Sequence, residues 1–123
     1  MLGWLFGTPD QVRLHLSEPR RMAGFIEFEK AKVRWFLSVN QADLPSSACD
    51  EQVKTYRSIT VDGREIEFSG GFTDLHTRVY EKVLAGEGFG IEDARPSVEL
   101  SHRIRTSELS FIDELAHPLL YEA

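Results

Sequence analysis

The sequence predicts an α+β fold, a largely antiparallel open β-sheet with helices packed on one of its faces. Three observations lead to this prediction. Five short segments between residues 11 and 68 have the composition of strands, and most of them alternate apolar and polar residues. Asp62-Gly63 lies between two of these segments and is typical of a two-residue hairpin turn. Two segments with apolar residues at helical spacing follow the last strand.

The composition describes an ordinary globular chain of 123 residues, which is the size of one domain. Hydrophobic residues make up 41% and charged residues 28%, so a disordered or fibrous chain is excluded. The 20 acidic residues outnumber the 14 basic ones, which argues against a nucleic-acid partner. The single cysteine, Cys49, and the lack of an apolar run long enough for a membrane span predict a cytoplasmic protein without membrane contact.

The first seven residues, Met1–Gly7, form a short apolar run. A helix of this length is marginal by itself, because nucleation costs more than one turn returns. Two interpretations stay open: a short surface turn tucked under the sheet, or the end of a longer helix that was cut.

Three strands are expected near the N-terminus, over residues 11–17, 22–29 and 31–39. In the first strand, alternation places His15 on the polar face and Leu14 on the apolar face. Because consecutive strands are joined by short connections, they should pair antiparallel.

Two further strands, over residues 55–61 and 64–68, flank the Asp62-Gly63 turn. Residues 40–54, which precede them, show no periodicity and are expected to form a long loop.

Two large aromatic side chains, Phe25 and Phe36, fall on the sheet face opposite Trp35. An aromatic patch on this face needs a cover. We therefore expect an oligomer interface at Phe25 and Phe36, where a second copy of the chain lies on the sheet.

Two helices are expected after the strands. The first has apolar residues at spacings of three and four, namely Phe72, Leu75, Val79 and Val83. Thr73 is its candidate N-cap and Gly86 its stop. The second should begin near Glu92, because Pro96 is tolerated only in the first turn.

The domain organisation that follows is a sheet-plus-helices domain over residues 1–106 and a C-terminal tail over residues 107–123. The tail is acidic and apolar by turns, and we expect a short helix or a docked tail there.

Candidate chemical groups are few. None of the four histidines has the spacing of a metal site, and Cys49 has no second cysteine, so no metal site is expected. Gly86-x-Gly88-x-Gly90 follows a helix rather than a strand and lacks the other features of a nucleotide loop. We interpret it as a link, and no cofactor site is expected in this chain.

The start of the first long helix is the candidate binding site. Thr73 and His76 lie three residues apart on one side of it, near free N–H groups that favour an anionic ligand. An ordinary helix cap with a surface histidine is the alternative. Asp74 and His76 are two residues apart and do not share a helix face, so spacing predicts no Asp–His relay.

Six motifs between residues 32 and 104 resemble, in order, those of a known family. They are VRWFLSV (33–39), DLP (43–45), TYRSITV (55–61), FTDLHT (72–77), LAG with GI (84–86 and 90–91) and DAR (93–95). Together they resemble the C-terminal half of bacterial sugar-nucleotide oxidases that act on UDP-N-acetylglucosaminuronate, within the Gfo/Idh/MocA oxidoreductase superfamily. The resemblance extends more weakly back to Met1–Gly7.

This resemblance implies one part of a larger enzyme. The family joins an N-terminal Rossmann domain that holds NAD to an open antiparallel sheet domain. Its catalytic lysine lies in a Glu-Lys-Pro motif and its catalytic histidine in a Gly-x-His-x-x-Asp helix, and neither motif occurs here. The chain would then lack the Rossmann domain, contain no catalytic or cofactor-binding residue and be inactive alone. Thr73 and His76 would face the sugar nucleotide.

Two functions stay open. The first is the C-terminal substrate-pocket and oligomerisation domain of an NAD-dependent UDP-sugar 3-oxidase in lipopolysaccharide O-antigen biosynthesis. The second is a stand-alone, non-enzymatic α+β binding or assembly module that dimerises through its sheet. The length of the native chain separates them, since about 200 further N-terminal residues, one Rossmann domain with a linking helix, support the first.

Overall fold

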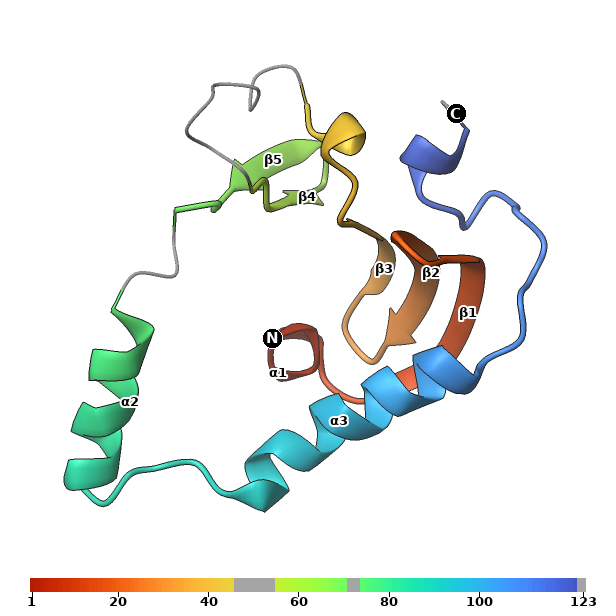
Figure 1. Cartoon of the computed structure of the whole chain (residues 1–123). Helices are drawn as coiled ribbons and strands as arrows, with labels where there is room; N and C mark the ends of the chain where they lie inside the picture. The colour runs from red at the N-terminus through yellow and green to blue at the C-terminus, as the bar shows by residue number, and fades with distance from the viewer. Residues whose placement is uncertain (46–54, 71–73, 122–123) are drawn as a thin grey trace. The chain divides into compact units, whose positions relative to one another are not determined.

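The computed structural model describes residues 1–45, 55–70 and 74–121, which belong to two compact units (Figure 1). The first unit comprises residues 1–39 and 90–123, and the second comprises residues 40–89. The α+β class and the antiparallel pairing are confirmed. The five expected strands are present, but in two sheets rather than one, three strands in the first unit and two in the second.

The sheet of the first unit has the order β1-β2-β3 and is antiparallel throughout. Its strands are β1 (Pro9–Glu18), β2 (Arg21–Phe28) and β3 (Lys32–Ser38). The central strand, β2, contributes most of the buried residues. The buried apolar residues of the described chain are Leu14, Ala23, Phe25, Ile26, Phe28 and Ala116.

An irregularity in β1 changes which way His15 points. The register with β2 shifts between Leu14 and Leu16, so His15 has no partner across the ladder. Such a bulge re-aims the extra side chain. His15 is 4% exposed, and its expected place on a solvent-facing polar face is wrong.

Two helices pack on this unit. The helix α1 (Leu2–Phe6) places the Phe6 ring 6.0 Å from that of Phe28. The helix α3 (Ile91–Thr106) contacts β1, where the Arg103 guanidinium donates a hydrogen bond of 2.7 Å to the Asp10 carbonyl. Helices on the sheet were expected, and α3 meets that expectation.

The N-terminus of α3 is capped by the side chain of a residue in its first turn. Asp93 Oδ2 accepts a hydrogen bond of 2.7 Å from the Gly90 N–H, which is at the N-cap. The helix begins at Ile91, so Pro96 lies in its second turn. We had expected Pro96 in the first turn, and this expectation is wrong. Proline lacks the N–H that would reach back to the carbonyl of Glu92.

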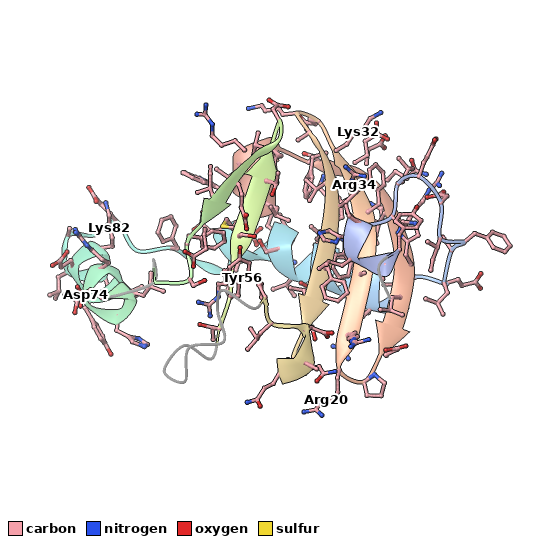
Figure 2. All side chains as sticks on the ribbon, turned by 90° about the horizontal axis from the view of Figure 1, so that it is seen from above. Arg20, Lys32, Arg34, Tyr56, Asp74 and Lys82 are labelled. Carbon is pink, nitrogen blue, oxygen red and sulfur yellow. The ribbon has the colours of Figure 1, made fainter. Side chains whose placement is uncertain are left out.

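Residues 107–121, here called the C-terminal segment, dock along the edge of the sheet. Ser110 N–H donates a hydrogen bond of 2.7 Å to the Leu14 carbonyl, beside a parallel bridge between Leu14 and Leu109. The segment then crosses to the sheet face opposite α3, where it forms the short helix η3 (Pro118–Leu120) (Figures 1 and 2). This segment therefore both docks on the sheet and contains a short helix, and the domain boundary at residue 106 stays a prediction.

The second unit consists of η1 (Gln41–Asp43), the hairpin β4 (Ser58–Val61) and β5 (Arg64–Glu67), and α2 (Leu75–Leu84). Asp62 and Gly63 both have positive φ, 50° and 80°, as a type I′ hairpin turn requires, so this prediction is confirmed. Cys49 lies outside the described residues.

The ends of α2 differ in how well the sequence predicted them. Gly86, at φ 75°, accepts the left-handed conformation that ends the helix, with its N–H bonded to the Val83 carbonyl. The N-cap is Asp74 rather than the expected Thr73, which lies outside the described residues. None of the helices in the described ranges is long and apolar enough to cross a membrane.

Candidate functional site

The predicted binding residues lie at the start of α2, in the second unit. His76 is the second residue of the helix and is exposed to solvent. Asp74, labelled in Figure 2, has the left-handed backbone conformation at φ 61° and makes no side-chain cap. Its carboxylate therefore does not occupy the N–H groups of the first turn. Because Thr73 is outside the described residues, the predicted pairing of Thr73 with His76 stays a prediction.

The apolar stripe of α2 is exposed in the second unit. Leu75, one of the apolar residues at helical spacing, is 52% exposed. Four more apolar side chains of this helix are exposed, namely Val79, Tyr80, Val83 and Leu84. The periodicity correctly predicted the helix, but its apolar side chains are not buried among the residues that the structure describes.

The predicted oligomer interface lies on the first unit. Phe25 pairs with Arg34, two residues before Phe36, so the two aromatic residues share one face as expected. Phe25 is only 2% exposed, and the Phe36 ring lies 5.8 Å from the His117 ring of the C-terminal segment. The chain's own residues thus cover part of this face, and the burial of Phe25 needs no second copy. The oligomer interface stays a prediction.

A cluster of charged groups joins β1 to the C-terminal segment. Arg13 Nη1 lies 2.8 Å from Asp113 Oδ2, and His15 Nε2 lies 3.6 Å from Asp113 Oδ1. Asp113 Oδ1 also accepts the Leu115 N–H at 3.0 Å. Both carboxylate oxygens of Asp113 therefore already have a partner other than His15.

Burial governs the ionisation of His15. Its side chain has no exposed surface, and neither ring nitrogen has a hydrogen-bond partner. Loss of hydration lowers the pKa of His15 below 6.5; the Asp113 carboxylate opposes this shift and the Arg13 guanidinium adds to it. The neutral imidazole is thus favoured in the folded chain.

A shallow hollow of about 460 Å³ lies where α1 leads into β1. It is lined by Thr8, Pro9, Asp10, Glu27, Phe28 and Glu29. Hydrogen bonds from Thr8 lower the pKa of Glu29 and keep it ionised. Three carboxylates in the lining repel anions, so this hollow is a poor place for the diphosphate of a sugar nucleotide.

The described residues form no metal cluster. Among residues 1–45, 55–70 and 74–121, no three histidine, cysteine or acidic side chains come together in a way that could hold a metal ion. The Gly86–Gly90 stretch connects α2 to α3 and follows no strand. It therefore lacks the strand–turn–helix arrangement that holds a pyrophosphate.

The chain is similar in sequence and in fold to solved structures of one dehydrogenase. No protein-family model matches the chain. A crystal structure of the WlbA (WbpB) dehydrogenase from Thermus thermophilus, in complex with NAD and α-ketoglutarate, matches 96% of it at 48% identity and a TM-score of 0.88. The chain is homologous to part of the WlbA dehydrogenase.

A second structure of that dehydrogenase gives the same result. The Thermus WlbA dehydrogenase in complex with NAD and UDP-GlcNAcA matches 96% of the chain at 46% identity and a TM-score of 0.87. The chain spans 38% of the length of these WlbA chains. The resemblance to Gfo/Idh/MocA sugar-nucleotide oxidases and the fold it implied are confirmed.

Sequence reasoning missed the His15–Asp113 cluster. The two residues are far apart in the chain, and the alternation in β1 predicted a solvent-exposed histidine. The bulge that turns His15 inward has no glycine or proline to mark it. The available signal was the acidic character of the C-terminal segment, which lies against the arginine of β1.

Proposed function

We propose that this chain is the sheet domain of an NAD-dependent UDP-sugar dehydrogenase of surface-polysaccharide biosynthesis, and that it shapes the substrate pocket and joins subunits. The observation that carries the proposal is the 48% identity over 96% of the chain to a dehydrogenase crystallised with NAD. The complex of that dehydrogenase with UDP-GlcNAcA supports the choice of substrate, UDP-N-acetylglucosaminuronate.

The reaction we propose for the whole enzyme is oxidation of the sugar C3 hydroxyl. A hydride leaves C3 and reduces NAD⁺ to NADH, while the hydroxyl proton goes to a base, so the carbon becomes a ketone. The lysine and histidine that the resemblance assigns to proton transfer belong to motifs that this sequence lacks. The chain's own contribution is therefore substrate positioning.

Within the chain, we assign substrate contact to Thr73 and His76 at the start of α2. His76 is exposed and lies in the first helical turn, where free backbone N–H groups favour an anion. Its imidazole can donate a hydrogen bond to a carboxylate or hydroxyl of the substrate. This role is binding and not proton transfer in the reaction.

The subunit-joining role rests on the Phe36 face and the β3 edge. Phe36 is half-buried on its face, and Leu37, on the opposite face of the edge strand β3, is 66% exposed. Light scattering of the chain should give a homo-oligomer, and Phe36→Glu should weaken it by placing a charge in an apolar contact. Phe89→Glu is the control, since Phe89 lies outside this sheet. A single-copy mass at high concentration would contradict the role.

A chimera tests the function as a whole. In it, this chain replaces the matching 38% of the Thermus WlbA dehydrogenase, which supplies the rest of the enzyme. The chimera should oxidise UDP-N-acetylglucosaminuronate with reduction of NAD⁺. A stand-alone binding module would fold into the chimera without supporting turnover.

A further inference from the structure

Two polar contacts join the C-terminal segment to β1 beside the bulge. Ser110 N–H donates to the Leu14 carbonyl, and Asp113 pairs with Arg13. On β1, Leu14 directly precedes the bulged residue His15, and Arg13 lies two residues before it. The segment has three acidic residues and no lysine or arginine, so it reaches β1 with negative charge. The environment of His15 therefore bears directly on whether the segment stays docked.

A protonated His15 would be poorly accommodated there. The imidazolium has two N–H donors, and Nδ1 has no acceptor within reach. Nε2 faces Asp113 Oδ1 at 3.6 Å, but that carboxylate already serves Arg13 and the Leu115 N–H. Burying a charge without full hydrogen bonding is unfavourable, so the docked state resists protonation of His15.

The other elements around His15 offer no compensation. The residues of β2 that pair on either side of the bulge, Ala23 and Gly24, carry no charge. The helix α3, which contacts β1, directs Arg103 to the Asp10 carbonyl. The charged groups that act on His15 are thus Asp113, which attracts the imidazolium, and Arg13, which repels it.

We propose that Arg13, His15 and Asp113 form an acid-sensitive latch: the segment is docked while His15 is neutral, and protonation of His15 releases it from β1. Opening hydrates the imidazolium and withdraws His117 from the Phe36 ring, against which it lies in the docked state. The latch is a property of the first unit and does not depend on the proposed enzymatic function.

Whether docking weakens at low or at high pH follows from the ionisation of His15 in the docked and the open state. Burial lowers the pKa in the docked state, whereas in the open state it is near 6.5. Above pH 6.5 both states hold neutral His15, and docking has its full stability. As the pH falls below 6.5, the open state takes up a proton that the docked state resists. The opening constant then rises by up to about tenfold per pH unit, until His15 also protonates in the docked state.

Hydrogen exchange at the Ser110 amide measures the opening directly. The exchange rate of this amide in the chain is followed by NMR between pH 7.5 and 5.0 and corrected for the intrinsic rate. We expect its protection to fall at least threefold below pH 6.5 in the wild-type chain. In His15→Gln, protection should not vary with pH, while His76→Gln, in the second unit, should behave as wild type. In His117→Gln, protection should be lower at every pH, because the contact with Phe36 and the cap of η3 are lost, but its dependence on pH should persist.

Two results would overturn the latch. One is pH-dependent opening that persists in His15→Gln or vanishes in His117→Gln; the other is protection that rises on acidification. If His15→Gln does not fold, the wild-type chain still decides. The opening should share its midpoint with the titration of the His15 ring, and a midpoint that follows another histidine contradicts the proposal.

Discussion

Arg13 and Asp113 are 100 positions apart in the sequence, yet Arg13 Nη1 and Asp113 Oδ2 lie 2.8 Å apart. This ion pair joins the first strand to the C-terminal segment and lies next to the buried His15. The Tyr121 hydroxyl donates to the Asp113 carbonyl, so the end of the segment is organised around the same residue. The segment is thus an integral part of the first unit, as the compact grouping of residues 1–39 with 90–123 indicates.

A double-mutant cycle on Arg13→Gln and Asp113→Asn should show favourable coupling of about 0.5–1 kcal/mol in the free energy of unfolding. The value is modest because the side chains are 34% and 37% exposed, so water screens the pair. Urea unfolding measures it, and high salt should reduce it. The pair of Arg95 and Glu92, at 53% and 81% exposure, is the control and should couple more weakly. Equal coupling in both pairs would contradict an anchoring role for Asp113.

Gly24→Ala should destabilise the chain by about 1–3 kcal/mol. A Cβ at Gly24 would collide with the Arg13 carbonyl and lie 2.9 Å from Trp35 Cζ2, so the central strand would have to move. Gly70→Ala is the matched control, because nothing lies within 4 Å of a Cβ there. Thermal unfolding of the two variants should show a lower Tm for Gly24→Ala alone. A similar Tm for both would mean that the strand pairing is not as close as described.

The fold was predictable wherever local pattern and packing agree. Alternation located β2 and β3 to within two residues, and Asp62-Gly63 correctly predicted the type I′ turn. The division into two sheets was not predictable, because strand alternation does not record which strands pair. The inward turn of His15 depends on a bulge, which no local residue type marks.

In the chimera, His76→Ala should raise KM for the UDP-sugar about three- to tenfold and lower kcat less. The exposed imidazole in the first turn of α2 is assigned to substrate binding, and its loss removes interactions made in the ground state. His102→Ala, an exposed histidine on α3, is the control and should leave both constants unchanged. Unchanged KM and kcat in His76→Ala would mean that His76 does not contact the substrate.

The candidate site was only partly accessible from the sequence. Spacing placed His76 at a helix start, and the structure has it there, exposed. Helical spacing records which face of the helix carries the residue but not which ligand that face meets, so no periodicity predicts the ligand. For Phe36 the pattern gave the correct face, but the ring that lies 5.8 Å from it belongs to His117 of the C-terminal segment, far along the chain. Long-range packing of this kind leaves no local signature.

Turnover by the chimera with the Thermus WlbA dehydrogenase shows whether this chain serves as the substrate-positioning domain of a UDP-sugar dehydrogenase. NAD⁺ binding, measured by calorimetry, first establishes that the chimera has folded. We expect this chimera to reduce NAD⁺ in the presence of UDP-N-acetylglucosaminuronate, and the chain alone not to do so. A chimera that binds NAD⁺ but neither binds nor oxidises the sugar nucleotide would rule out the proposed function.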